Sequence, residues 1–400
     1  MAAALEGIRV LDLSRVLAGP WAAMTLGDLG AEVLKVEQPG TGDDTRRWMP
    51  PSTGGLSTYY LAANRNKKGL AIDMAQPEGR TLILDLARQS DILIENFRPA
   101  SLRRLGLTFQ QLHAVNPRLI VCSISGYGRG HELEERPGYD FIIQAESGFM
   151  AITGEVEGAP MRLGVAFVDL ISGMNAVQAI LAALYMRERS GRGQWLDIGL
   201  TDSAAFLLAN VASGYLNTGA EPVRFGNAHP SIVPYQLFDC ADGPLAVAVG
   251  NDQQFRRFCA AIARPDLPGD ARFATNKGRA ENRAPLLAIL SAALAGLPRG
   301  ALLAELRAAG VPAGEVRSVA EALTSDIAGL RGTVVAVEDA RIGEYRSVRS
   351  PLRLSDSPFA PPTPPPDIGQ HTAQVLADLL HLPPEEIARL AEAGVIGVAP

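Results

Sequence analysis

The chain has 400 residues, 47% of them hydrophobic, with 37 basic and 43 acidic side chains. A formal net charge of −6 without a block of Lys and Arg excludes a general electrostatic surface for nucleic acid or anionic membrane. The length exceeds the roughly 250–300 residues at which one core stops growing, so two domains are expected and a single small module is excluded.

The predicted compartment is the cytoplasm, with an organelle matrix as the alternative. The N-terminal residues lack the charged and apolar regions of a secretion signal, and no apolar stretch reaches the ~18 residues that span a bilayer. Cys122, Cys240 and Cys259 lie far apart without metal-ligand spacing, which favours buried thiols in a reducing compartment over disulfides. No membrane and no nucleic acid is therefore expected as a partner.

The first 125 residues predict strands that alternate with helices. Short apolar runs predict strands at 8–14, 31–36, 70–73, 91–95 and 119–124, with helices at 21–29, after a Gly-Pro turn at 18–20, and at 77–88. Such alternation is typical of a mostly parallel α/β sheet covered by helices on both faces.

Polar and aromatic residues follow three of these strands directly: Ser14-Arg15, Asn96-Phe97-Arg98 and Ser125-Gly126-Tyr127. In open α/β sheets, ligands bind in the crevice at the carboxyl ends of the strands. Arginines, an amide and aromatic rings there suit a phosphate-bearing ligand with a flat ring. The ordinary alternative is that the small residues shape turns and the arginines are solvated. Their shared position at strand ends favours a site.

The clearest helix follows an apolar, strand-like run at 163–168 and extends from Asp169 to near Gly191, with apolar residues at i, i+3 and i+4 spacing. Asp169 is predicted as an N-cap, because Asp accepts hydrogen bonds from free amides of a first helical turn. It also suits a nucleophile, because the positive end of the helix dipole keeps a carboxylate ionised. Both roles can hold at once.

Composition changes at Gly219 and predicts a second, smaller α/β domain. We expect a strand at 245–249 and helices at 254–263 and 283–295. Prolines between 355 and 366 predict a stiff connector, followed by helices at 372–380 and 384–394. The predicted division is a large domain at 1–218, a small domain at 219–325, and a C-terminal segment at 326–400 that packs back onto the body.

Several common catalytic motifs are missing from the sequence. No G-x-G-x-x-G follows the first strand and no G-x-x-x-x-G-K-[ST] occurs, which argues against dinucleotide oxidoreductases and P-loop NTPases. The five histidines form no H-E-x-x-H, and G-x-S-x-G is absent, which argues against metalloenzymes and α/β-hydrolases. We therefore expect no metal.

A set of sequence segments resembles the class III CoA-transferase family, which includes formyl-CoA transferases. The segments are 11–20, 29–37, 64–68, 95–97, 138–140 and Asp169, and the match covers essentially the whole chain. Within the family, segments 224–235, 249–255 and 369–372 are most similar to the succinyl-CoA:glutarate CoA-transferase subgroup. The resemblance implies a Rossmann-like large domain completed by the C-terminal segment, a small domain, and two chains interlocked as a homodimer.

The resemblance also implies a reaction. Asp169 would attack an acyl-CoA thioester and form an aspartyl anhydride, then an aspartyl-CoA thioester that an acceptor carboxylate attacks. The donor would be succinyl-CoA or a related dicarboxyl-CoA, and the acceptor a glutarate-like acid. CoA enters as the acyl-CoA substrate, and no permanently bound cofactor is required.

By resemblance, eight residues are expected to contact CoA: Arg15, Val16, Ala18, Asn96, Phe97, Arg98, Arg104 and Tyr139. Gly250, Asn251, Asp252 and Gln253 correspond to the family's active-site loop but are poorer in glycine. Gln38 and Ala75 replace basic residues of formyl-CoA transferases, so phosphate contacts are expected to shift to Lys35, Lys68 or Arg98. Candidate groups for the acceptor's distal carboxylate are Arg46, Arg47, Arg65, His229, Ser231 and Tyr235, each of which also suits a structural role.

Two other functions stay open. An α-methylacyl-CoA racemase needs acid and base groups beside the substrate α-carbon, typically a histidine directly before an aspartate. Tyr139 occupies that place before Asp140, so His131 or His229 would have to be recruited. A non-catalytic CoA-binding protein, with Asp169 only as a cap, is the third possibility.

Overall fold

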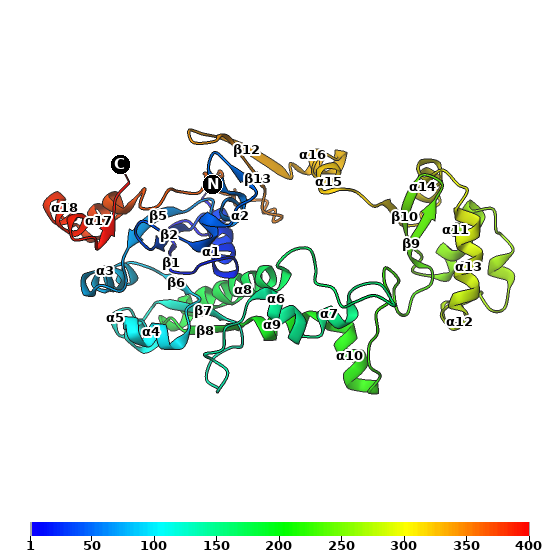
Figure 1. Ribbon diagram of the computed structural model, residues 1–400, viewed down its shortest axis with the longest axis horizontal. Coiled ribbons are helices and arrows are strands. Elements are labelled where there is room, and N and C mark those ends of the chain that lie inside the picture. Colours follow the sequence, from blue (N-terminus) through cyan, green and yellow to red (C-terminus); the bar gives the residue numbers. More distant parts are fainter. Residues whose placement is uncertain (1, 400) are drawn as a thin grey trace. The chain divides into compact units, whose positions relative to one another are not determined.

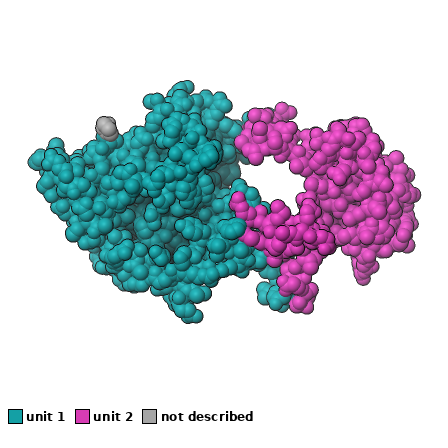
Figure 2. Space-filling view, viewed as in Figure 1, with its two compact units in different colours: residues 1–149, 163–217, 329–400 teal, residues 150–162, 218–328 magenta. Residues whose placement is uncertain are grey.

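The computed structural model describes residues 2–399, which divide into two compact units (Figure 2). Unit 1 takes residues 2–149, 163–217 and 329–399, and unit 2 takes residues 150–162 and 218–328. The division differs from the predicted one chiefly at 150–162, which belongs with the small unit although the sequence analysis assigned it to the large domain.

A seven-stranded sheet forms the centre of unit 1. Its strands, in spatial order, are β14 (Ile396–Gly397), β5 (Lys68–Ile72), β2 (Glu32–Glu37), β1 (Arg9–Asp12), β6 (Ile92–Glu95), β7 (Ile120–Ser125) and β8 (Trp195–Gly199). All neighbours pair in parallel except β14, which runs antiparallel to β5. Numbered along the chain, the six parallel strands have the 3-2-1-4-5-6 order of the Rossmann fold. The predicted mostly parallel α/β sheet is confirmed.

Helices cover both faces of the sheet because the strands bury both of their faces. One face packs on α1 (Ala18–Asp28) and α8 (Phe167–Ser190), and the other on α3 (Pro77–Arg88), α4 (Pro99–Leu105), α5 (Phe109–Val115), α17 (Thr372–Leu380) and α18 (Pro384–Glu392). Val10 joins the first core and its neighbour Leu11 the second, as the two-residue period of a strand requires.

The C-terminal segment of unit 1 completes the sheet beside β5, and α17 also contacts α3 (Figure 1). The His371 N–H donates to the Gly69 carbonyl (2.9 Å), and the Gly69 N–H donates to His371 Nδ1 (3.1 Å). The Ala71 N–H donates to Thr372 Oγ1 at 3.0 Å. These bonds satisfy backbone groups that an open edge strand would expose.

Shorter elements of unit 1 connect or flank the sheet. They are η1 (Asp44–Arg47), β3 (Ser52–Thr53), β4 (Leu56–Ser57), α2 (Thr58–Ala63), α6 (Asp140–Glu146), α9 (Leu200–Leu207), α10 (Ala209–Thr218), β12 (Val334–Asp339) and β13 (Gly343–Val348). The short helix α7 (Phe149–Ile152) crosses the boundary, and its last three residues belong to unit 2. The β12–β13 hairpin is anchored on α2, where the Tyr345 hydroxyl donates to the Leu61 carbonyl at 3.0 Å.

Unit 2 is built on an antiparallel sheet of β11 (Ala313–Glu315), β10 (Gly243–Ala248) and β9 (Tyr235–Cys240). Its helices are α11 (Asp252–Ala261), η2 (Leu267–Gly269), α12 (Asn276–Glu281), α13 (Arg283–Leu294), α14 (Arg299–Ala308) and α15 (Val319–Leu323), and α16 (Asp326–Arg331) follows at the boundary. Phe238, Phe255, Phe258 and Phe273 fill its core.

Local predictions differ from the structure in four places. Residues 18–20, predicted as a turn, form the first turn of α1. The predicted strand at 163–168 does not exist, because α8 begins at Phe167. The sequence analysis assigned no element to residues 202–215, most of which lie in α9 and α10. The strands β8 and β14 were not predicted.

Helix α8 is long and apolar enough to cross a membrane by length and composition. It packs against α1, α9, β7 and β8 within unit 1, and Ile180 and Ala183 on it are almost completely buried. One side of α8 therefore lies in the core of unit 1, whereas Met174, Tyr185 and Met186 on it are exposed.

The contact between α1 and α8 requires a glycine at position 173. A Cβ there would lie 2.6 Å from the Ala18 carbonyl oxygen and 3.3 Å from Trp21. We predict that Gly173→Ala destabilises the protein by about 1–3 kcal/mol despite its higher helix propensity, because the backbone of α1 would have to move. Gly214→Ala on α10, where a Cβ meets nothing within 4 Å, is the control. Equal unfolding midpoints in urea for the two variants would contradict this packing argument.

Candidate active site

The strand order reverses between β1 and β6, and the loops that leave these two strands face each other. In sheets of this type, the crevice at the reversal point is the usual ligand site. Asn96 joins the two loops: its side chain accepts from the Arg15 N–H (2.9 Å) and donates to the Arg15 carbonyl (2.7 Å). The Arg15 guanidinium lies 5.6 Å from the centre of the Phe97 ring. The three predicted residues therefore come together.

Glu95 and Arg129 fix the backbone at Phe97. The Glu95 carboxylate accepts from the Phe97 N–H at 2.8 Å, and the Phe97 carbonyl accepts from Arg129 at 2.9 Å. Glu95 and Arg129 form an ion pair of 2.9 Å in which both side chains are buried. Neither residue was predicted as part of the site, although Glu95 belongs to segment 95–97, which is part of the family resemblance.

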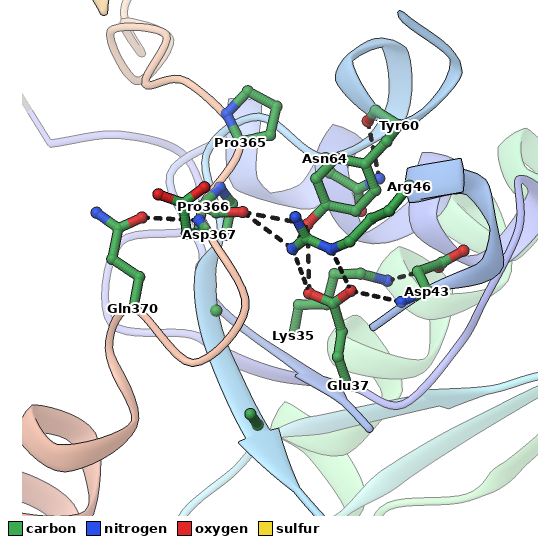
Figure 3. Close-up of polar contacts among 12 residues, drawn as sticks. Lys35, Glu37, Asp43, Arg46, Tyr60, Asn64, Pro365, Pro366, Asp367 and Gln370 are labelled. Atoms are coloured by element: carbon green, nitrogen blue, oxygen red, sulfur yellow. Dashed lines mark hydrogen bonds and ion pairs between the residues drawn. The ribbon is translucent and has the colours of Figure 1, made fainter. Parts of the chain in front are cut away.

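Val16 adopts a backbone conformation that β-branched residues rarely adopt, with φ at 72°. The Asp43 carboxylate holds this turn by accepting from the Val16 N–H at 3.2 Å. Asp43 also accepts from Lys35 Nζ at 3.1 Å, and both side chains are completely buried (Figure 3). Burial alone would lower the pKa of Lys35, but Asp43 and Asp12 raise it above its ordinary value. Lys35 is thus committed to Asp43, and its expected contact with CoA phosphate is wrong.

Arg46 connects this turn to the C-terminal segment (Figure 3). Its guanidinium donates to both oxygens of Glu37 (2.8 and 2.6 Å), and Glu37 accepts from the Asp43 N–H at 2.7 Å. Arg46 also donates to the Tyr60 hydroxyl (2.6 Å) and to the Pro366 carbonyl (3.0 Å). These bonds make Arg46 structural and unavailable to an acceptor carboxylate.

A pocket of about 320 Å³ lies beside the two loops, between the carboxyl ends of the strands and α4. The pocket contains three of the predicted CoA residues, Arg15, Phe97 and Arg104, together with Gln38 and Ala75. Ala18 starts α1, which has no side-chain cap, and Arg98 and Tyr139 are the exposed residues that precede α4 and α6. Lys68 does not line this pocket, and it pairs with Glu32 at the opposite end of the sheet.

Asp169 is the third residue of α8, and its carboxylate is not the cap of that helix. The cap is Asp140, whose Oδ1 accepts from the backbone N–H groups of Val168 (2.8 Å) and Asp169 (3.3 Å). Among residues 2–399, no group donates a hydrogen bond to the Asp169 carboxylate. The predicted capping role is therefore wrong, and the carboxylate is free to react.

The environment of Asp169 makes it unusually basic. Burial first, and the nearby Asp140 carboxylate second, raise the pKa of Asp169 from 3.8 to about 7. A carboxylate in this range is a stronger nucleophile than an ordinary aspartate but is still ionised in part at neutral pH. Perturbed carboxyl groups of this kind gather at catalytic sites.

Tyr59 on α2 is a further site residue that the sequence analysis missed. Burial and the charges of Asp169, Asp140 and Asp43 raise its pKa to about 12. Its hydroxyl therefore stays protonated at neutral pH. Trp48 packs against its ring, with centroids 5.0 Å apart. No motif pointed to Tyr59, since it lies in a short helix between two loops.

The tentative substrate residues have structural contacts. Arg65 is buried and donates to both carboxylate oxygens of Asp28, at 2.9 and 2.5 Å, so the structure contradicts a free Arg65. In unit 2, His229 Nδ1 accepts from the N–H groups of Ser231 and Ile232, and the His229 ring lies 5.4 Å from that of Tyr235. His229 is thus a hydrogen-bonded loop histidine, whereas Tyr235 lies partly exposed on β9.

The segment at 250–253 also belongs to unit 2. Asn251 caps α11 by accepting from the Gln254 N–H at 2.9 Å, and Gln254 accepts from the Gly250 N–H at 2.8 Å. Gln253 is exposed, and Asp252 accepts from the buried Arg279 at 2.8 Å. These bonds hold residues 250–253 in a turn at the start of α11. They give no support to the expectation that this segment is a mobile lid.

Two observations concern the racemase alternative and metal binding. His131 bonds to the Tyr127 carbonyl through Nε2 (2.8 Å) and accepts from the Leu133 N–H through Nδ1 (3.2 Å), so both nitrogens are engaged in its own loop. Among the described residues, no three His, Cys, Asp or Glu side chains form a cluster that could hold a metal ion.

Comparisons with known proteins show the family and the fold of the chain. The family model described as CoA-transferase family III matches residues 5–372. Succinate–glutarate CoA-transferase of Agrobacterium fabrum is 43% identical over 381 residues, covering 94% of this chain and 95% of that protein. Succinyl-CoA:glutarate CoA-transferase of Homo sapiens is 40% identical over 392 residues, covering 98% and 90%. The crystal structure of a CAIB/BAIF family protein from Brucella suis superposes with a TM-score of 0.85 at 42% identity, covering 95% of this chain and 100% of that one.

The raised pKa of Asp169 has a consequence for stability. Between about pH 4 and 7 the folded protein keeps a proton on Asp169 that the unfolded chain releases, so stability falls as the pH rises through this window. An amide in place of this carboxyl group would not titrate. We predict that the melting temperature of Asp169→Asn equals that of the wild type near pH 4 and exceeds it increasingly up to pH 7. A difference that does not change with pH would contradict the assigned environment.

Proposed function

The chain belongs to CoA-transferase family III, and from this membership we propose that it transfers CoA from succinyl-CoA, or a related dicarboxyl-CoA, to a glutarate-like acid. The observation that carries the proposal is an unbonded, basic carboxylate, Asp169, in the same unit as the pocket at the β1–β6 reversal. The family uses CoA thioesters as substrates, and no permanent cofactor is needed.

The choice of substrates rests on the relatives. The proteins of Agrobacterium fabrum and Homo sapiens are named for succinate or succinyl-CoA and for glutarate, and both align over nearly the whole chain. The polar groups that would meet the distal carboxylate are not Arg46 or Arg65, because both are fully paired. Tyr235 and Ser231 stay as candidates from the sequence.

We assign the adenosine and phosphate portions of CoA to the pocket at the strand reversal. Phe97 offers an aromatic face for the adenine ring, and Arg15, Arg98 and Arg104 offer positive charge for phosphates. The uncapped first turn of α1 at Ala18 offers backbone N–H groups to the same anions. The neutral Gln38 and Ala75 shift the phosphate contacts onto these arginines.

The proposed chemistry starts at Asp169. One carboxylate oxygen attacks the thioester carbonyl carbon, the C–S bond breaks, and CoA leaves as a thiolate. The thiolate then attacks the aspartyl carbonyl of the mixed anhydride, which releases the donor acid and leaves an aspartyl-CoA thioester. The acceptor carboxylate repeats these two steps in reverse order and departs as the new acyl-CoA. No proton is gained or lost overall.

The residues around Asp169 suit these steps. A pKa of about 7 gives Asp169 nucleophilic strength while a large fraction stays ionised at neutral pH. The protonated Tyr59 hydroxyl is a donor for the negative charge that develops on the carbonyl oxygen in each addition step.

Assembly and compartment belong to the same proposal. We expect the family's interlocked homodimer, in which each chain contributes to the assembly. The buried free thiols of Cys122, Cys240 and Cys259 suit a reducing compartment, which we take to be the cytoplasm.

The racemase alternative has less support. Its base would have to be His131, His229 or Asp140, and each is engaged in a structural hydrogen bond. The non-catalytic alternative needed Asp169 as a helix cap, a role that Asp140 fulfils instead.

The central test is an exchange assay in deuterated water. Purified protein is incubated with succinyl-CoA, a panel of free carboxylic acids that includes glutarate, and a branched acyl-CoA. We predict glutaryl-CoA without enzyme-dependent deuterium, detected by mass spectrometry. Asp169→Ala should abolish the exchange and keep CoA binding. Deuterium at the α-carbon of the branched ester would favour the racemase, and substantial turnover by the variant would overturn the nucleophile.

Arg104 provides a separate test of the CoA pocket. We predict that Arg104→Ala raises KM for succinyl-CoA about tenfold and changes kcat less than about twofold, because the lost charge-assisted contact is made equally in the ground state and the transition state. Arg103→Ala is the control, because Arg103 pairs with Glu135 outside the pocket. An unchanged KM would remove Arg104 from the CoA site.

A further inference from the structure

Asp140 occupies a position between two helix starts. It is the first residue of α6 and is 7% exposed, and its two carboxylate oxygens serve different partners. Oδ1 accepts from the Val168 and Asp169 N–H groups of α8, and Oδ2 accepts from Gln144 Nε2 at 2.6 Å. In all three bonds the Asp140 carboxyl group is the acceptor.

The connections around Asp140 fix its position. Gln144 is completely buried, and its Oε1 accepts from the Leu163 N–H at 3.0 Å, which ties the loop before α8 to α6. The loop before α6 passes so close to the loop after β7 that a Cβ on Gly138 would lie 2.6 Å from the Gly126 Cα. The carboxylate of Asp140 therefore cannot move away from α8 without breaking bonds on both sides.

We propose that Asp140 is a positioning residue for the nucleophile Asp169, acting by the hydrogen bonds that hold the first turn of α8 and by its negative charge beside Asp169. The inference rests on the proposed function, in which Asp169 attacks the thioester. Asp140 itself touches no reacting atom.

The two actions have distinct physical consequences. The hydrogen bonds satisfy two of the free amides of α8 and so fix the direction in which the Asp169 side chain leaves the helix. The charge opposes ionisation of Asp169, which offsets the stabilisation that a helix N-terminus gives to a carboxylate. Asp169 would otherwise be a weaker nucleophile held at the positive end of a helix.

Among residues 2–399, Asp140 is the charged group that acts most on Asp169, and the other ionisable residue of α6, Glu146, pairs with Arg136. Tyr59 on α2 is neutral because its pKa is raised to about 12. On the neighbouring α1, the ionisable residue is Asp28, which pairs with Arg65. On α9 it is Asp202, which lies near Gly199, and on β8 it is Asp197, which accepts from the Arg129 N–H. Asp140 is thus the carboxylate whose removal should change Asp169 most.

The experiment separates the two actions with two variants. Asp140→Asn keeps an oxygen that can accept from α8 but removes the charge, whereas Asp140→Ala removes both. For Asp140→Asn we expect the acidic limb of the pH profile of kcat/KM to move down by roughly one unit, with kcat at pH 8 reduced about tenfold and KM for succinyl-CoA within about twofold. Asp140→Ala should also lower the melting temperature.

Melting temperatures do not depend on catalysis. They therefore test the action of Asp140 on Asp169 even if the proposed function is wrong. The difference in melting temperature between the wild type and Asp169→Asn should stop growing once Asp169 of the folded protein is ionised, so the pH at which it levels off reports that ionisation. We expect this pH to fall when the same pair is compared in the Asp140→Asn background. Asp202→Asn on α9 is the matched control and should leave it unchanged.

Each outcome decides the inference. Unchanged pH midpoints in both readouts for Asp140→Asn would overturn the role of its charge, and a wild-type melting temperature for Asp140→Ala would overturn the role of its hydrogen bonds. Absence of CoA transfer by the wild type would refute the proposed function, and the melting measurements would still decide whether Asp140 acts on Asp169.

Discussion

Side chains satisfy the backbone of the two loops that leave β1 and β6, and the candidate CoA pocket depends on these bonds. Where the strand order reverses, no neighbouring strand supplies partners to the loops. Asn96 therefore bonds the Arg15 backbone, Asp43 the Val16 N–H, and Glu95 the Phe97 N–H. An unmet buried backbone group costs about 1–3 kcal/mol, so these bonds stabilise the φ of 72° at Val16. The pocket is fixed before any ligand binds.

The first turn of α8 contains a carboxylate, that of Asp169, which accepts no hydrogen bond from the described residues although it lies at a helix N-terminus. Free amides there would ordinarily capture the nearest carboxylate as a cap. Asp140 takes that place, so the Asp169 oxygens accept no hydrogen bond from the described residues. A cap on α8 needs only one acidic residue, Asp140. The second, Asp169, lowers the stability of the folded protein above about pH 4, and the proposed reaction requires it.

Periodicity predicted the parts of the fold that depend on local patterning. Five of the six parallel strands and α3, α13, α17 and α18 follow from apolar spacing and Pro positions, because each buries a regular face. β8 and β14 were missed because exposed Trp195 and a two-residue strand leave no pattern. Asp169 was predicted, but its capping partner lies 29 residues earlier, and no spacing rule connects Asp140 to α8. The pairing of Arg65 with Asp28 likewise joins distant segments.

Burial explains which cations can serve a ligand and which cannot. Lys35 and Arg46 are buried against Asp43 and Glu37, and separating such pairs would leave an uncompensated charge in the core, at a cost of about 3–5 kcal/mol. Arg15 pairs with Asp44 at 3.7 Å, but both side chains are about half exposed, and such pairs contribute about 0–1 kcal/mol. A phosphate can therefore replace Asp44 at Arg15 with little loss. The basic residues that sequence counting treats alike thus divide into buried structural ones, such as Lys35 and Arg46, and exposed ones, of which Arg15 lies at the strand reversal.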